Sequence, residues 1–248
     1  MKTIALIPVR YAPSRFPFKP MQLLGDKPVI VHTYENTLGT GLFNEVVVVT
    51  DSEIIYNEIS RRGGNVVMSK KDHESGSDRI AEAAESMDAE IILNVQGDEP
   101  FVEKAPLEKL LNAFKGNEGK EVQVASIMQV LSEESSIRDP NVVKVVVDKN
   151  NYSLLFSRSI IPYPRDQEEK IKYYGHIGVY AFRREALLNF PLMEMTPLEK
   201  AEKIECLRYL ENGIRLKMVE TDYPGVKIDT KEDFEKALDY LKKYQKSR

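Results

Sequence analysis

Residues 3–20 read TIALIPVRYAPSRFPFKP. The first seven, Thr3 to Val9, form an apolar run of strand length that is rich in β-branched residues. The remainder holds three cations, Arg10, Arg15 and Lys19, interleaved with three prolines. Proline cannot continue a helix and holds its neighbours extended. The stretch therefore predicts a buried strand that ends in a stiffened basic loop.

The place of this loop indicates an anion site. In open α/β sheets, ligands bind beyond the carboxyl ends of the strands. An arginine fork matches phosphate oxygens, and lysine supplies a compact positive charge. Arg10, Arg15 and Lys19 therefore suit a triphosphate. The alternative is a solvated basic loop without a ligand, and the apolar strand directly before the loop makes that alternative less favourable.

The composition limits the class of protein. The chain has 248 residues, enough for one large α/β domain or two small ones, and its 42% hydrophobic and 30% charged residues are typical of a globular protein. A net charge of −4 argues against nucleic acid as the main partner.

The single cysteine, Cys206, excludes an internal disulfide and fits a reducing compartment. No apolar run approaches the ~20 residues of a membrane span. Pro8 and Arg10 interrupt the apolar N-terminus, which is therefore interpreted as a strand and not as a signal peptide. We expect no membrane partner and a cytoplasmic location.

Strands and helices alternate in the first half of the chain. The predicted strands are 3–9, 45–50, 66–68, 90–95 and 122–130, and the predicted helices are 28–38, 53–62, 78–87 and 106–114. Ser52 or Asp51 is expected to cap the second helix, whose inner face would hold Ile54, Ile55 and Ile59. Ser75 or Ser77 is expected to cap the third. This alternation predicts an α/β fold, a mostly parallel mixed sheet with helices on both faces.

The regular alternation of strands and helices ends after residue 131. A hairpin is predicted from 142–147 and 152–156, followed by a strand at 177–182, a helix at 197–210, a strand at 214–220 and a closing helix at 231–244. No linker divides the chain. We therefore predict a single domain over 1–248, in which 131–225 is an elaboration.

Two aspartates are the best candidates for metal chemistry. Asp98 follows the fourth predicted strand in the sequence QGDEP, and Asp229 follows a short apolar run in VKIDTKED. Mg²⁺ is held in proteins by one or two carboxylates together with substrate phosphates, so the pair makes a plausible joint site. Alternatively, Asp98 forms a turn and Asp229 caps the last helix. No Walker A or dinucleotide fingerprint is present, and the three histidines lack paired metal spacing.

Eight motifs occur in a fixed order from the first strand to the last helix. They are RYAPSRFPFKP, DHESGSDRI, NVQGDEP, PNVVKVV, LLFSRSIIPYPR, GHIGVYAF, EKIECLRYLENG and IDTKEDFEKAL. Together they resemble the 3-deoxy-manno-octulosonate (KDO) cytidylyltransferases, also called CMP-KDO synthetases.

The resemblance implies a Rossmann-like nucleotide-sugar transferase fold and a homodimer, with 131–225 contributing to substrate binding and dimerisation. It implies transfer of CMP from CTP to the anomeric hydroxyl of KDO, with release of pyrophosphate. The product would be the activated sugar for lipopolysaccharide assembly. The implied cofactor is Mg²⁺ on Asp98 and Asp229. A second Mg²⁺ on the β and γ phosphates has no obvious protein ligand in the sequence.

The resemblance also assigns roles to individual residues. The catalytic residues would be Arg10, Lys19 and Asp98. The nucleotide-binding residues would be Pro8, Arg10, Arg15, Lys19, Ser75, Arg79 and Gln96. The sugar-binding residues would be Gln96, Arg158, His176, Tyr180 and Glu205. For the sugar set, His176 could instead be a structural strand-end histidine and Glu205 a surface charge.

The chain departs from the family at two positions. It has Phe18 where the family usually has glycine, and Cys206 where the family usually has glutamine. The second departure leaves the preferred acid sugar open between KDO and a related one such as 8-amino-KDO or a sialic acid. A catalytically silent nucleotide-binding relative is a further alternative, although such a protein would be expected to lack one of Arg10, Lys19, Asp98 and Asp229. A scaffold protein would leave the basic loop unexplained.

Overall fold

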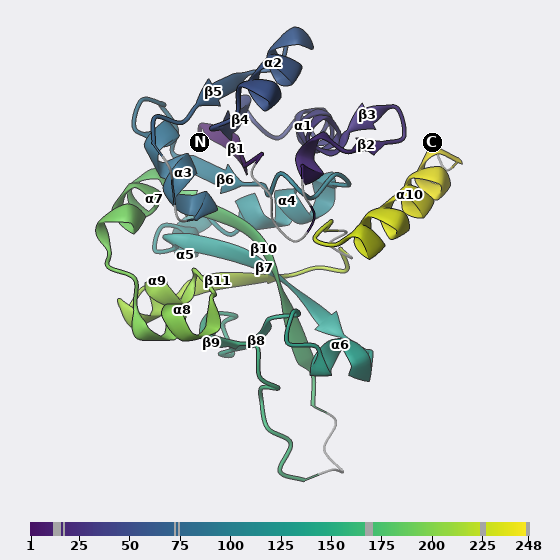
Figure 1. Cartoon of the computed structure of the whole chain (residues 1–248). Coiled ribbons are helices and arrows are strands. Elements are labelled where there is room, and N and C mark those ends of the chain that lie inside the picture. Colours follow the sequence, from purple (N-terminus) through teal and green to yellow (C-terminus); the bar gives the residue numbers. More distant parts are fainter. Residues whose placement is uncertain are drawn as a thin grey trace. The chain divides into compact units, whose positions relative to one another are not determined.

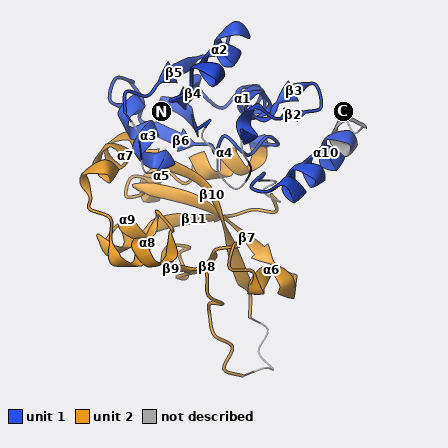
Figure 2. Ribbon diagram, viewed as in Figure 1, with its two compact units in different colours: residues 1–104, 225–248 blue, residues 105–224 orange. Residues whose placement is uncertain are grey.

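The computed structural model describes residues 1–11, 16, 18–71, 73, 75–166, 171–223 and 227–246. Arg15, one of the predicted phosphate ligands, lies outside the described residues. The chain forms two compact units, one of residues 1–104 with 225–248 and the other of residues 105–224 (Figure 2). Apart from residue 225, the predicted elaboration lies in the second unit. Whether the chain acts as one domain stays a prediction.

The first unit contains a parallel sheet of four strands in the order β6-β1-β4-β5 (Figure 1). The strands are β1 (Thr3–Val9), β4 (Glu45–Thr50), β5 (Val66–Met68) and β6 (Ile91–Asn94). The seven residues of β1 are all buried, because strands lie on both sides of β1 and helices cover the sheet. The predicted first strand is therefore confirmed as the centre of this sheet.

The order of the strands changes direction beside β1. The chain passes from β1 through α1 (Val29–Gly39) to β4, and through α2 (Glu53–Arg61) to β5. It then returns through α3 (Gly76–Ala84) to β6 on the other side of β1. Because such crossovers are right-handed, α1 and α2 cover one face and α3 covers the opposite face. The carboxyl ends of β1 and β6 therefore form a topological switch point, where ligands bind in α/β folds.

Two of the predicted helix caps are confirmed. The Ser52 hydroxyl accepts a hydrogen bond from the Ile55 amide at the start of α2, and Ser75 forms a reciprocal capping box with Asp78 at the start of α3. The predicted inner face of α2 is partly wrong. Ile55 and Ile59 are buried, but Ile54 is 49% exposed, because residues four apart share a helix face and adjacent residues do not.

The basic loop is followed by a 3₁₀ turn, η1 (Lys19–Met21), and a small hairpin of β2 (Leu23–Leu24) and β3 (Lys27–Pro28). Phe18 adopts a left-handed conformation with φ of +55°, and its ring contacts Tyr11 at 4.8 Å between centroids. A position with positive φ favours glycine, which is the residue that the family usually has there. The departure at Phe18 thus leaves the turn in place and adds a ring contact across the loop.

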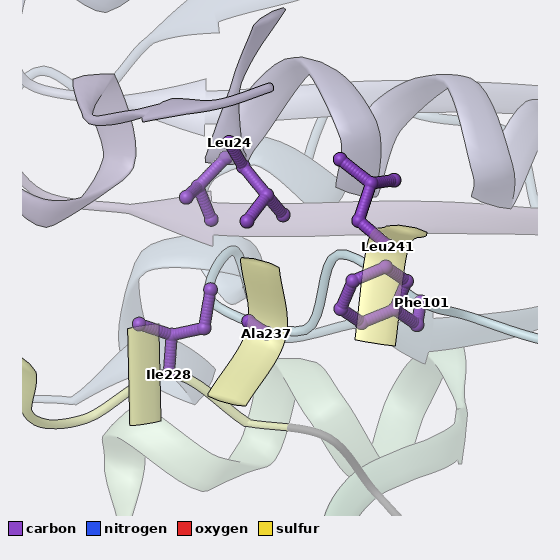
Figure 3. Close-up of a cluster of buried hydrophobic side chains, with 6 residues drawn as sticks. Leu24, Phe101, Ile228, Ala237 and Leu241 are labelled. Carbon is purple, nitrogen blue, oxygen red and sulfur yellow. The ribbon is translucent and has the colours of Figure 1, made fainter. Parts of the chain in front are cut away.

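The last helix, α10 (Lys231–Lys246), is held on the first unit by an apolar cluster (Figure 3). Its buried members come from the small hairpin, the start of α1, the segment after β6 and the end of the chain: Leu24, Val29, Phe101, Ile228, Ala237 and Leu241. Burial of each larger side chain contributes about 1.5–3 kcal/mol. The cluster therefore fixes the segment that carries Asp229.

The second unit contains a mixed sheet. In it, β7 (Val124–Leu131) pairs antiparallel with β10 (Tyr173–Arg183) and parallel with β11 (Leu216–Glu220). The predicted hairpin is confirmed as β8 (Lys144–Val147) and β9 (Ser153–Ser157), and β8 pairs with β10. The helical segments of this unit are α4 (Lys104–Asn112), whose first residue belongs to the first unit, α5 (Gly116–Gly119), α6 (Glu134–Arg138), α7 (Arg184–Asn189), η2 (Phe190–Leu192), α8 (Pro197–Glu202) and α9 (Leu207–Glu211).

The predicted continuous helix over 197–210 is wrong. The structure has two short helices, α8 and α9, because Lys203 adopts a left-handed conformation with φ of +55° that ends α8. A buried ion pair joins the two helices, since the Arg208 guanidinium makes two contacts of 2.7 Å with the Glu199 carboxylate. The break leaves Glu205 and Cys206 in the turn between the helices.

With these corrections, the predicted α/β class and the mostly parallel mixed sheet flanked by helices are confirmed. Among the helices built from described residues, none combines the length and the apolar character needed to cross a bilayer.

Candidate active site

A pocket lies at the switch point of the first unit. Its walls come from the end of β1, the basic loop, the start of α3 and the segment after β6: Pro8, Val9, Arg10, Phe16, Lys19, Pro20, Gly76, Arg79, Gln96, Gly97 and Asp98. A side chain at Gly97 would place its Cβ 3.0 Å from the Pro8 carbonyl oxygen. Glycine therefore lets the QGDEP segment pass closely over the end of β1. Five of the predicted nucleotide-binding residues line this pocket, namely Pro8, Arg10, Lys19, Arg79 and Gln96.

Four charged residues meet at one edge of the pocket, and we call them the carboxylate–lysine cluster: Lys19, Asp98, Lys227 and Asp229. The Lys19 ammonium lies 2.7 Å from Asp98 Oδ2 and 3.1 Å from Asp229 Oδ1. The Lys227 ammonium lies 3.1 Å from Asp229 Oδ2 and 3.8 Å from Asp98 Oδ2. The two aspartates that the sequence proposed as a pair thus share two cations.

The backbone brings the two aspartates together. The Ile228 amide donates to the Asp98 carbonyl oxygen at 3.0 Å, and the buried Ile228 side chain belongs to the apolar cluster under α10. The capping bonds of α10 are made by Thr230 and Asp233, not by Asp229: the Asp233 amide donates to the Thr230 hydroxyl and the Thr230 amide to the Asp233 carboxylate. The alternative of Asp229 as the helix cap is therefore wrong, and its carboxylate faces the lysines.

The cluster changes the proton affinities of its members. Burial raises the pKa of the Asp229 carboxyl, but the nearby Lys227 and Lys19 ammonium groups outweigh burial and lower that pKa below its usual value. The Asp98 carboxylate raises the pKa of Lys227 well above its usual range. Both residues are therefore charged at neutral pH. Burial, reinforced by the Asp98 charge, raises the pKa of the neighbouring Glu99 to about 8, so Glu99 is largely protonated there.

The donor set of this cluster fits a hard cation. Asp98 Oδ1 is buried and receives no hydrogen bond from the described residues, and carboxylate oxygens are the ligands that Mg²⁺ prefers. Within the described part of the chain, no three acidic, histidine or cysteine side chains gather in a way that could hold a metal without further ligands. Two carboxylates fit a cation that completes its coordination with substrate oxygens and water.

The remaining predicted nucleotide ligands are held by other parts of the first unit. Arg10 is exposed and donates a hydrogen bond to the His73 carbonyl oxygen. Arg79 is only 1% exposed and forms a 2.6 Å ion pair with Asp51, which follows β4. Ser75 caps α3 and is not among the residues that line the pocket. The structure thus brings Arg10 and Arg79 to the pocket, while Ser75 fixes the helix that carries Arg79.

Gln96 is oriented by a residue that the sequence reasoning did not select. The Gln96 amide nitrogen donates to Asn94 Oδ1 at 3.1 Å, at the end of β6. Asn94 is fully buried, and its own amide nitrogen has no partner among the described residues. In the motif NVQGDEP, the asparagine two residues before Gln96 is the sequence feature that could have predicted this contact. Lys227 was likewise missed, although it stands two residues before Asp229.

The predicted sugar ligands, apart from Gln96, lie in the second unit. His176 on β10 sits between two rings, 4.8 Å from Phe156 and 5.4 Å from Tyr180. Burial lowers the pKa of its imidazole to about 3, so the ring is neutral at physiological pH. Ser126 Oγ lies 2.8 Å from His176 Nε2 and 2.9 Å from the Val179 carbonyl oxygen. Ser126 Oγ carries one proton and also reaches the Ile177 carbonyl oxygen at 3.2 Å. Because carbonyl oxygens only accept, this arrangement favours the tautomer in which His176 Nε2–H donates to Ser126 and Nδ1 is an acceptor.

Tyr180 and Cys206 form the other side of this group, which we call the His176 cluster (Ser126, Phe156, His176, Tyr180 and Cys206). The two side chains are hydrogen-bonded, and both are almost fully buried. Burial raises the pKa of each hydroxyl or thiol above its usual value, so both are neutral. Glu205, adjacent in the turn, adds a negative charge that acts on both groups. Burial and this charge keep the Cys206 thiol from ionising.

Arg158 has a different environment from the one expected for a sugar ligand. Its guanidinium donates to the carbonyl oxygens of Glu202 and Pro140, at 2.6 and 2.8 Å, and its backbone amide donates to the Glu202 carboxylate. These contacts tie β9 to the end of α8. The Arg158 contacts are thus structural, and a role in sugar binding stays a prediction.

Comparison with known proteins places this geometry in a class. A sequence model described as cytidylyltransferase matches residues 4–220. The 3-deoxy-manno-octulosonate cytidylyltransferases of Flavobacterium johnsoniae and Christiangramia forsetii are 54% and 52% identical to this chain, over 98% and 97% of it and 99% and 97% of their own lengths. A solved CMP:2-keto-3-deoxy-manno-octonic acid synthetase complexed with CTP aligns with a TM-score of 0.93 at 36% identity, covering 98% of this chain and all of that one.

The fold and the pocket define a nucleotidyltransferase of the cytidylyltransferase class. Within that class, the chain belongs to the 3-deoxy-manno-octulosonate cytidylyltransferase family. The resemblance that the eight motifs suggested is confirmed, and so is the Rossmann-like nucleotide-sugar transferase fold.

Proposed function

We propose that this protein transfers CMP from CTP to 3-deoxy-manno-octulosonate and releases pyrophosphate. The observation that carries the proposal is the meeting of Asp98 and Asp229 on Lys19, beside the pocket at the carboxyl end of β1. Carboxylates that suit a metal ion then lie beside basic side chains that suit a triphosphate. Relatives that are more than half identical and bear the name of this activity support the same reaction.

The protein acts in this reaction mainly by positioning and by charge stabilisation, which dominate phosphoryl-type transfers. The anomeric hydroxyl of the sugar releases its proton to water and its oxygen attacks the α-phosphorus of CTP, while the bond from that phosphorus to the pyrophosphate oxygen breaks. In this proposal, Lys19 and Arg10, which both line the pocket, stabilise the negative charge that grows on the leaving pyrophosphate. Gln96, fixed by Asn94, presents an amide to the sugar or the ribose.

Asp98 and Asp229 are the residues that would hold Mg²⁺ in this proposal. When bound, Mg²⁺ supplies Lewis-acid stabilisation of the α-phosphate and lowers the pKa of a coordinated hydroxyl. The unsatisfied Asp98 Oδ1 supports this assignment, because a buried carboxylate oxygen without a partner is costly unless it meets a cation.

The neutral His176 cluster suits recognition of sugar hydroxyls. His176 Nδ1 is an acceptor, and the neutral Tyr180 hydroxyl is held beside it. Neutral hydrogen-bond donors and acceptors can distinguish one arrangement of hydroxyl groups from another, and they do not attract anions non-specifically.

The decisive experiment offers CTP and MgCl₂ with a panel of sugar acids and measures pyrophosphate release. The panel contains KDO, 8-amino-KDO and N-acetylneuraminic acid. Fastest turnover with KDO is expected. Preference for another acid sugar would reassign the substrate and implicate Cys206. Nucleotide binding without pyrophosphate release from any acceptor would identify a silent relative. The Asp98→Asn variant, assayed in parallel, is the matched control for contaminating activity.

We further propose a cytoplasmic homodimer that supplies lipopolysaccharide assembly. The single cysteine, which is buried, is compatible with a reducing compartment. The product of the proposed reaction is an activated form of a lipopolysaccharide sugar. Light scattering coupled to size-exclusion chromatography checks the dimer, because a chain of 28.3 kDa gives clearly different masses for one and two copies.

A further inference from the structure

Lys227 is placed where a divalent cation is expected to bind. Its ammonium lies 3.1 Å from Asp229 Oδ2 and 3.8 Å from Asp98 Oδ2. Together with Lys19, it engages three of the four oxygens of the aspartate pair. The fourth, Asp98 Oδ1, is buried and receives no hydrogen bond from the described residues. The two lysines thus balance the charge of the two carboxylates.

The two lysines differ in how firmly they are held. The Lys19 side chain is only 12% exposed, at the end of the stiffened loop, and it contacts both aspartates within 3.1 Å. The Lys227 side chain is 46% exposed and has one close contact. A half-exposed lysine on a flexible stem can extend into solvent, and the attraction that it loses to the two aspartates is one that a divalent cation would replace. Lys227 is therefore the cation that can leave.

A cation that binds this pair must compete with Lys227. Carboxylate oxygens that accept hydrogen bonds from an ammonium are less available to a metal, and two cations about 4 Å apart repel each other. Withdrawal of Lys227 frees Asp229 Oδ2 without disturbing the contacts of Lys19.

We propose that Lys227 is a tethered competitor of the divalent cation, occupying the aspartate pair in the metal-free protein and leaving it when the cation binds. The inference rests on the proposed metal role of Asp98 and Asp229. Its consequence is that the free enzyme holds the cation weakly. A cation that arrives with a triphosphate is favoured, because the phosphates attract the displaced ammonium.

The test measures Mn²⁺ binding to the full chain without nucleotide, by the loss of the electron paramagnetic resonance signal of free MnCl₂. Lys227→Met keeps the length of the side chain and removes its charge. We expect Lys227→Met to bind Mn²⁺ about 10-fold more tightly than the wild type at low ionic strength, with a smaller gain in 0.5 M KCl because salt screens the repulsion.

Lys231→Met is the matched control. Lys231 is exposed at the start of α10, forms no ion pair with the described residues, and carries the same charge four positions further along the chain. It should leave the affinity within about twofold, since an exposed charge that makes no ion pair with either aspartate among the described residues is screened by solvent. Equal gains from both variants would assign the effect to net charge and overturn the proposal.

Asp98→Asn separates the failure of this inference from the failure of the metal site. If Asp98→Asn removes Mn²⁺ binding while Lys227→Met leaves it unchanged or weaker, the metal site stands and the competitor role is wrong. If Asp98→Asn has no effect on Mn²⁺ binding in either background, both assignments are wrong.

A rise in the KM for CTP in Lys227→Met at unchanged Mn²⁺ affinity would make Lys227 a phosphate ligand instead. Circular dichroism checks that each variant is folded. If Lys227→Met folds poorly, Lys227→Gln takes its place in the binding measurement.

Discussion

The carboxylate–lysine cluster and the His176 cluster satisfy their polar groups in opposite ways. The first pairs two carboxylates with two ammonium groups and leaves one carboxylate oxygen without a partner. The second is neutral, because burial lowers the pKa of His176 to about 3 and raises the pKa of both Tyr180 and Cys206. Charged groups stabilise charge that moves during a reaction, whereas neutral groups read the shape and hydroxyl pattern of a ligand.

The largest effect is expected from Asp98→Asn. Loss of the carboxylate charge should weaken the proposed metal site and leave the Lys19 charge less balanced, so turnover should fall by about 10²–10³-fold. The fold should survive, since Asp98 follows the buried strand and supports no core. Pyrophosphate release and a thermal melt measure the two properties. Full activity with an unchanged melt would remove Asp98 from the chemistry.

Lys19→Met should have the next largest effect. It removes a cation that is proposed to contact the triphosphate and should lower kcat by about 10²-fold, with little change in the KM for the sugar. Steady-state kinetics with each substrate varied in turn measures the split. If the KM for the sugar changed as strongly as kcat, Lys19 would also take part in sugar binding. The assignment of charge stabilisation to one cluster and sugar recognition to the other would then be wrong.

His176→Gln tests the neutral cluster through pH. The pKa of His176 in the folded protein, about 3, lies below the unfolded value near 6.5, so only the unfolded chain binds a proton between these values. The free energy of unfolding should therefore fall as pH drops below 6.5, by at most about 1.4 kcal/mol per pH unit, with no contribution above. Glutamine keeps a hydrogen-bond donor for Ser126 and cannot be protonated in this range, so this pH dependence should disappear in the variant.

Urea denaturation at pH 5 and pH 7 checks this prediction. The loss of stability between the two pH values should be smaller in His176→Gln than in the wild type by up to about 2 kcal/mol. The same loss in both proteins would show that the imidazole is not buried neutral. The KM for the sugar should rise about 10-fold in the variant while the KM for CTP stays constant.

Tyr180→Phe should have the smallest effect. It removes one hydroxyl, hydrogen-bonded to Cys206, from a cluster that otherwise stays packed. A rise of about 3- to 10-fold in the KM for the sugar is expected, because one neutral hydrogen bond contributes about 0.5–1.5 kcal/mol. Isothermal calorimetry with CTP should show no change. Altered CTP affinity would place Tyr180 outside sugar recognition.

The regular parts of the fold were predictable because they rest on periodicity. The strands β1, β4 and β5 and the hairpin of β8 and β9 follow from apolar runs and turn residues. The helices α5, α6 and α7 have four to six residues, too few for a helical period to emerge, and they were missed. The break at Lys203 was missed because a left-handed lysine carries no sequence signal comparable to glycine.

The site was predictable where one residue type suits one chemistry. Asp98 and Asp229 stood after apolar runs, and the structure brings both to Lys19. The supporting residues could not be found in this way. Asp51 contacts Arg79, which is 28 residues further along the chain. Asn94 and Lys227 contact Gln96 and Asp229, each two residues away, but no sequence pattern marks either contact.

The Lys19–Asp229 contact joins residues that are 210 positions apart, and residues 225–248 belong to the same compact unit as the first strand. During synthesis, the ribosome releases the basic loop long before it releases Asp229. The nascent chain therefore carries the basic loop without Asp229 until translation has passed residue 229. A ribosome that stalls before residue 229 would yield a chain in which Lys19 lacks one of its two carboxylate partners.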